Sequence, residues 1–163
     1  MEFSSIISLV SAGTALVASV VGPVITLTVA QRQFNATVIS ANRQKWIETM
    51  RDTLAELIAL IRAALVVKSK WKDKWDRGLG PLNADPAMLD KFEHIVLAQS
   101  KIELLMNPID GDHQRLYETI ESAIERLRAE ESLEAETLHD IRTITALGQA
   151  ILKREWQRVK IGA

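Results

Sequence analysis

The strongest constraint on the fold of this chain is a long N-terminal stretch without charge. From Phe3 to Gln31 the sequence has no Asp, Glu, Lys or Arg, and Ile6 to Ala30 is mostly apolar or small. A helix of about 20 such residues crosses the hydrocarbon core of a bilayer. The sequence therefore predicts a transmembrane helix within residues 1–31, followed by a helical domain formed by residues 32–163.

A cleaved signal peptide is the rival interpretation, because Thr28-Val29-Ala30 loosely resembles a cleavage site. No basic residue precedes the apolar run, and the run is long for a signal peptide, so an uncleaved anchor is favoured. Glu2 is the only charge before the stretch, whereas Arg32 and further cations follow it. The positive-inside rule then predicts a single span with the N-terminus outside and residues 32–163 in the cytoplasm.

Small and hydroxyl-bearing residues gather on one side of this predicted helix. At about 100° per residue they fall in one sector, opposite a sector of Leu, Ile and Val. Such a face predicts close helix-to-helix contact or the lining of a water-filled pore. Loose, weak self-association is the plainer alternative, since Ser and Ala are tolerated anywhere in a span. The residues expected to line the pore or the contact are Ser8, Ser11, Ala15, Ala18, Ser19, Gly22 and Thr26.

Four amphipathic segments follow and predict an all-α fold, a cytoplasmic four-helix bundle after the transmembrane helix. Apolar residues recur at intervals of three and four, and Gly, Pro and capping residues separate the segments. Helix could also run on from the span into the first segment, with a break near residues 35–42. The expected bundle helices cover residues 42–76, 86–107, 112–130 and 132–160.

The composition leaves little room for enzyme chemistry. The chain has 20 basic and 21 acidic residues and no cysteine, which argues against general nucleic-acid binding and excludes thiolate chemistry. Glu136 and His139 have the Glu-x-x-His spacing of bundle metal sites, but the second such motif is missing. The sequence therefore predicts a non-enzymatic protein with no metal, no cofactor and no small-molecule substrate.

Two charged regions have both a functional and a plain interpretation. Basic and aromatic residues mix in Lys68-Ser-Lys70-Trp71-Lys72-Asp73-Lys74-Trp75, which we call the basic–aromatic segment. Its residues Lys70, Trp71, Lys74 and Trp75 are candidate contacts for RNA or a protein partner. The plainer alternative is a bundle end with inward tryptophans and solvated lysines. The acidic residues of 118–136 and the basic residues Lys153, Arg154, Arg158 and Lys160 predict either solvated faces or pairing between adjacent subunits.

Two local patterns carry a resemblance to a known group of proteins. The first is Arg43-x-x-Trp46-Ile47-x-x-Met50-Arg51, soon after the span, and the second is Lys101-Ile102-Glu-Leu104-Leu105-Met-Asn107-Pro108, followed by His113-x-x-Leu116. Together they resemble small bacterial one-span membrane proteins. That group includes the membrane accessory protein of type VI-B CRISPR systems.

This resemblance implies a degenerate HEPN-like bundle in a bacterial inner membrane. It also implies a pore made by a ring of about eight identical subunits, in antiviral defence, with a CRISPR effector or its RNA as partner. An active HEPN ribonuclease has an Arg four to six residues before a His, and here Asn107 stands near that place before His113.

We therefore expect Arg43, Trp46, Arg51, Asn107 and His113 to be structural or interface residues rather than catalytic ones. At the junction between the second and third helices, His113 is expected to bond exposed carbonyl groups. The alternative function is a membrane-tethered binding module whose bundle recruits a soluble protein or RNA.

Overall fold

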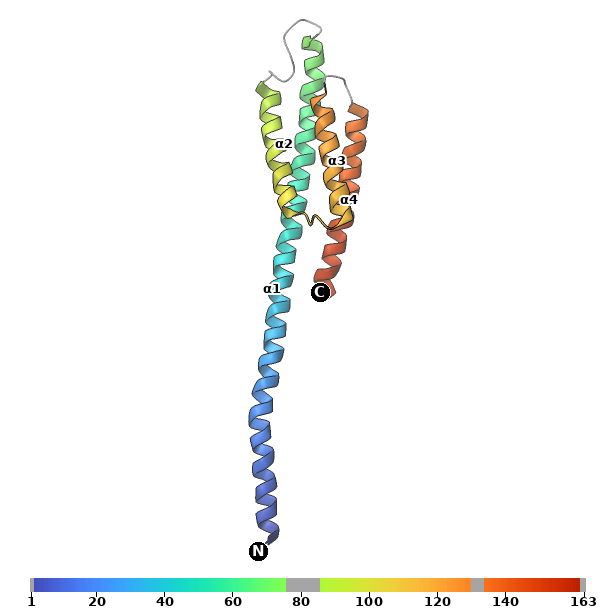
Figure 1. Ribbon diagram of the computed structural model, residues 1–163. Helices are drawn as coiled ribbons and strands as arrows, with labels where there is room; N and C mark the ends of the chain where they lie inside the picture. Colours follow the sequence, from blue (N-terminus) through green and yellow to red (C-terminus); the bar gives the residue numbers. More distant parts are fainter. Residues whose placement is uncertain (1, 76–85, 130–133, 162–163) are drawn as a thin grey trace. The chain divides into compact units, whose positions relative to one another are not determined.

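In the computed structural model the described residues form α-helices joined by turns, with no strand among them (Figure 1). It describes the backbone of residues 2–75, 86–129 and 134–161, and side chains from Thr26 onward with gaps. The helices are α1 (Glu2–Trp75), α2 (Pro86–Leu105), α3 (Gly111–Arg128) and α4 (Glu134–Ile161). The predicted all-α class and helical bundle are confirmed.

Helix α1 is continuous where the sequence predicts a break. The predicted break near residues 35–42 is wrong, because α1 is helical through this stretch. The Thr37 hydroxyl donates to the Gln33 carbonyl oxygen at 2.8 Å, one helical turn back. Neither Gly nor Pro occurs between Val24 and Arg77, so no residue there removes a donor from the helical ladder.

The chain divides into two compact units, residues 1–42 with 162–163, and Arg43–Ile161. The predicted boundary at residues 31 and 32 stays a prediction. Of the predicted pore-facing residues only Thr26 has a described side chain, which is exposed; the other six side chains lie outside the description. Among the residues that the structure describes, no helix is both long and apolar enough to cross a membrane.

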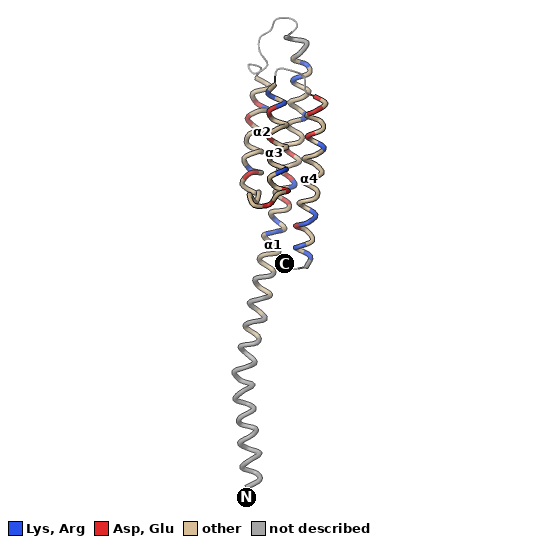
Figure 2. The backbone as a smooth tube through the Cα atoms, turned by 45° about the vertical axis from the view of Figure 1, so that its right-hand side comes forward, with Lys and Arg blue, Asp and Glu red and all other residues tan. Residues whose placement is uncertain are grey.

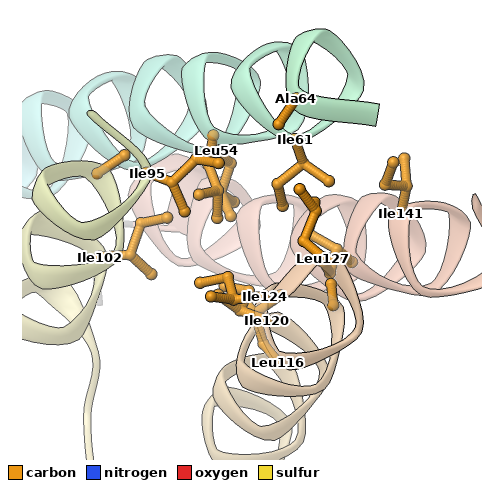
Figure 3. Close-up of a cluster of buried hydrophobic side chains, with 14 of the residues drawn as sticks. Leu54, Ile61, Ala64, Ile95, Ile102, Leu116, Ile120, Ile124, Leu127 and Ile141 are labelled. Atoms are coloured by element: carbon orange, nitrogen blue, oxygen red, sulfur yellow. The ribbon is translucent and has the colours of Figure 1, made fainter. Parts of the chain in front are cut away.

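The core of the second unit is formed by all four helices (Figure 3). The inner face of α3 is apolar, since Leu116, Ile120, Ala123, Ile124 and Leu127 are buried. Each fully buried Leu or Ile side chain contributes about 1.5–3 kcal/mol through removal from water. At Gly148 of α4 an added Cβ would lie 3.0 Å from the Leu54 Cδ1 of α1, so a larger residue there would require the Leu54 side chain to shift.

Candidate functional site

Three of the five motif residues meet at the turn between α2 and α3. The Trp46 indole Nε1 of α1 donates to the Leu105 carbonyl oxygen at 2.8 Å, which satisfies a group at the end of α2. The Trp46 ring stacks on the His113 ring with centroids 6.0 Å apart. The Asn107 backbone N–H donates to His113 Nδ1 at 3.0 Å. The motif therefore ties α1, α2 and α3 together.

The backbone of this turn follows from its sequence. Pro108 cannot continue the hydrogen-bond ladder of a helix, and the Asn107 side-chain oxygen accepts from the Ile109 N–H at 3.1 Å. The Asn107 carbonyl oxygen in turn accepts from the Asp110 N–H at 3.1 Å. These bonds reverse the chain over a few residues and place His113 in the first turn of α3.

His113 is a buried, neutral group, with 5% of its surface exposed. Because Nδ1 accepts a hydrogen bond, the ring proton is assigned to Nε2. Burial lowers the pKa of His113, and the positive charge of Arg154 adds to this effect against three nearby carboxylates. The expectation that His113 bonds carbonyl groups is wrong, because its ring accepts from the amide N–H of Asn107, just after the end of α2.

Arg154 of α4 binds two carboxylates at the same junction. Its Nη2 lies 2.6 Å from an Asp110 oxygen, and its Nη1 lies 2.8 Å from an Asp112 oxygen. Asp110 is also the N-cap of α3 and accepts from the backbone N–H groups of Asp112 and His113. Burial acts to raise the pKa of Asp110, but the bonds from Arg154 and Asp112 outweigh it and the pKa is lowered.

The remaining two motif residues are placed differently from each other. Arg43 lies beside the junction, with Nε 3.6 Å from an oxygen of the largely buried Glu155. Among the described residues Arg43 Nη1 has no hydrogen-bond partner although it is buried. Arg51 is exposed and pairs with its neighbour Asp52, so it takes no part in the cluster. The sequence pattern grouped these two arginines because they share one face of a helix, whereas only Arg43 lies at the junction.

At the opposite end of α3 a lysine has the corresponding position. Lys68 of α1 donates from Nζ to the carbonyl oxygens of Arg126, Leu127 and Ala129, at 3.1, 3.3 and 2.5 Å. It is buried, and burial lowers its pKa. The plainer interpretation of its segment, with all lysines in solvent, is therefore wrong for Lys68.

The proposed RNA or partner contacts follow Lys68 along α1. Lys70 is exposed and Trp71 is half-buried, whereas the side chains of Lys74 and Trp75 lie outside the described residues. Glu118, Glu121 and Glu125 are exposed along α3, as the solvated-face interpretation expects, while Glu130 and Glu131 lie outside the description.

The Glu-x-x-His pair does not become a metal centre in the described parts of the chain. Glu136 and His139 are both exposed on α4. In those parts, no three His, Asp or Glu side chains lie together in a way that would hold a metal ion.

Sequence reasoning missed two residues of the site. Arg154 was grouped with the basic C-terminal residues, and Lys68 with the basic–aromatic segment. A local signal for Arg154 exists in the acidic residues Asp110 and Asp112 at the start of a helix. Two carboxylates that are partly buried require a cationic partner. No local signal distinguishes Lys68 from Lys70, because only packing buries one of them.

The outer side of α2 carries exposed apolar residues, with the exposed polar residues Glu93 and Ser100 between them, although its inner side already belongs to the core. Met88, Ile95, Ala98 and Ile102 face inward and are buried. On the opposite side Leu89 and Leu97 are each 53% exposed and Leu104 is 87% exposed. A helix on the surface of a monomeric bundle normally carries polar residues on its outer side. We call Leu89, Val96, Leu97 and Leu104 the α2 outer stripe.

Comparisons with known proteins identify no relative of this chain. No family model, no curated protein and no solved structure matches it. Its function is therefore argued from its residues and their geometry, and the resemblance to one-span membrane proteins stays a prediction.

Proposed function

We propose that this chain is a membrane-anchored helical protein that associates with copies of itself into a pore or another membrane-perturbing oligomer. The uncharged segment of residues 3–31 would be the anchor, and its small-residue face would line or seal the channel. The resemblance of the motifs to CRISPR accessory proteins is the reason to assign it to antiviral defence, without enzymatic activity. The observation that carries self-association is the α2 outer stripe.

Self-association would bury the α2 outer stripe. Exposed apolar side chains that follow one face of a helix mark a surface that binds another protein. A second copy of the chain fits as occupant, because an anchor confines all copies to one plane with their bundles on one side. Confinement raises the effective concentration of the stripe, so that modest contacts suffice for association.

Leakage of a dye from liposomes that contain the full-length protein tests this function. Wild type should release the dye, and the double variant Leu97→Glu, Leu104→Glu should release much less, because two charges would be buried at the contact. Val66→Glu is the matched control, because Val66 is 53% exposed on α1, outside the stripe. The proposal fails if wild type never leaks, or if the control loses as much release as the stripe variant.

A second variant examines the span itself. Ala15→Leu places a bulky residue on the small-residue face and should change the rate of leakage without changing how much protein enters the liposomes. An unchanged rate would show that this face neither lines a channel nor packs against another helix.

The α2 outer stripe also supports the alternative of a membrane-tethered module that recruits a soluble partner. In that case the span is only an anchor, and a chain lacking residues 1–31 keeps its partner while the wild type never releases dye. If the partner were RNA, Lys70→Glu would weaken the capture, since Lys70 is an exposed cation of the basic–aromatic segment.

A further inference from the structure

We propose that the C-terminal end of α4 is a docking site for the anionic surface of a lipid bilayer. The site comprises Lys153, Trp156, Arg158 and Lys160, which we call the α4 tip. This inference depends on the proposed function, because it takes the uncharged segment as a membrane anchor.

The α4 tip extends beyond the α2–α3 junction. Arg154 is held at that junction by Asp110 and Asp112, so the residues after it continue past the turn (Figure 1). Trp156 is 48% exposed there, which is unusual for the largest apolar side chain. The ammonium group of Lys160 lies 3.7 Å from the centre of its ring. An aromatic ring and a cation thus lie together on the exposed surface of the tip.

The charge of the tip is strongly one-sided. The last acidic residue of the sequence is Glu155, and its carboxylate is already engaged by Arg158 at 2.7 Å and Arg43 at 3.6 Å. Lys153 and Lys160 are exposed, and neither has a carboxylate partner in the described part of the chain. Figure 2 shows the cations along this part of α4. Such a cluster is attracted to anionic lipid headgroups, and Trp is favoured at the depth of those headgroups.

The position of the tip in the bundle agrees with this occupant. The contact between Arg43 and Glu155 places the tip at the end of the bundle where α1 enters. Along the chain, only residues 32–42 separate Arg43 from the uncharged segment, and a chain of that length reaches at most about 40 Å. The other basic–aromatic segment, which contains Lys70, lies beyond Lys68 at the opposite end of the bundle.

The absence of cysteine allows a direct test with single spin labels on the full-length protein. We would label Gln157→Cys at the tip, and Gln149→Cys two turns earlier as the control, since both glutamines are exposed. The protein is reconstituted in phosphatidylcholine vesicles with or without phosphatidylglycerol. In anionic vesicles the Gln157 label should become accessible to oxygen dissolved in lipid and protected from an aqueous nickel chelate. The Gln149 label should stay aqueous in both.

Charge reversal tests the cause of the docking. At the proportion of anionic lipid that half-protects the wild type, Lys153→Glu with Lys160→Glu should lower the ratio of protected to aqueous Gln157 label by at least about tenfold. Arg142→Glu, an exposed cation near the other end of α4, should leave it unchanged. An equal effect of the two changes, or no effect of the first, overturns the proposal.

A third label separates this inference from the function on which it depends. Leu16→Cys lies in the sector of the predicted span that should face lipid. If its label is in lipid while the Gln157 label stays aqueous in anionic vesicles, the tip proposal is wrong and the anchor stands. If the Leu16 label is aqueous, the anchor itself is wrong. If single-stranded RNA, and not anionic lipid, immobilises the Gln157 label, the tip binds nucleic acid and the lipid proposal is overturned.

Discussion

Each end of α3 is bound by a long cationic side chain from another helix, but the groups that accept its hydrogen bonds differ. At the N-terminal end Arg154 of α4 binds the carboxylates of Asp110 and Asp112. At the C-terminal end Lys68 of α1 binds carbonyl oxygens only. Both arrangements agree with the helix dipole, which favours acidic groups at the start of a helix and cations at its end.

Because of this difference, we expect acid to affect the stability of the two ends differently. The N-terminal end contains Asp110 and His113, whose pKa values are both lowered by their surroundings. The acceptors around Lys68 are backbone carbonyls, which do not titrate. We therefore expect the α2–α3 junction to be more sensitive to acid than the bonds that Lys68 makes at the other end of α3.

The largest expected effect is the loss of Trp46. Trp46→Ala should lower the free energy of unfolding by about 3–5 kcal/mol, because it removes both the packing on His113 and the bond to Leu105. Trp46→Phe keeps a ring and should cost only about 1 kcal/mol. Urea denaturation in detergent, followed by circular dichroism, measures both. A loss below about 1 kcal/mol for the alanine variant would mean that the junction is peripheral to stability.

The next effect concerns the opposite end. Lys68→Met keeps the length of the side chain but leaves three carbonyl oxygens without their donor, at a cost of about 1–3 kcal/mol. Amide hydrogen exchange should also become faster in the last turn of α3. Lys70→Met is the control, and because Lys70 is exposed its change should be within about 0.5 kcal/mol. Equal effects of both changes would contradict the assigned role of Lys68.

A smaller effect is expected for the cap of α3. Asp110→Ala removes the oxygen that accepts from two backbone N–H groups and should cost about 1 kcal/mol. Asp110→Asn keeps a cap but loses the charge that faces Arg154, so it should fall between wild type and the alanine variant. Thermal unfolding at neutral pH measures this order. An asparagine variant as unstable as the alanine variant would assign the effect to Arg154 rather than to the cap.

The smallest effect is the pH dependence due to His113. Its pKa in the folded chain is below the ordinary value of 6.5, so the unfolded chain binds the proton more readily. Stability from this group is complete above about pH 6.5 and declines as the pH falls from there through the folded pKa. His113→Gln should flatten the change in unfolding free energy between about pH 7.5 and 5.5. An unchanged slope would mean that another group titrates in this range.

The helices were predictable because their signals are local. The expected limits of the last three, residues 86–107, 112–130 and 132–160, agree with the observed ones within about two residues. The expected break near residues 35–42 failed because Asn35 and Asn42 are only weak helix formers, and their cost of less than about 1 kcal/mol each did not interrupt the helix.

The contacts of the site were less predictable than its residues. Trp46, Asn107 and His113 were singled out from sequence, and they do meet at one junction. Their bonding and the contributions of Arg154 and Lys68 depend on how the helices are rotated against one another. The groups that Arg154 and Lys68 bind lie about 40 to 60 residues away in the sequence, which no periodicity within one helix encodes.

The most direct test of the central claim, self-association of an anchored bundle, is the mass of the complex extracted in detergent. Native mass spectrometry would give the number of subunits, with electron microscopy along the membrane axis to show their arrangement. We predict a closed ring of identical subunits that breaks down to smaller species in the Leu97→Glu, Leu104→Glu variant. A monomer or dimer of the wild type, at concentrations where the protein is active, would contradict this account.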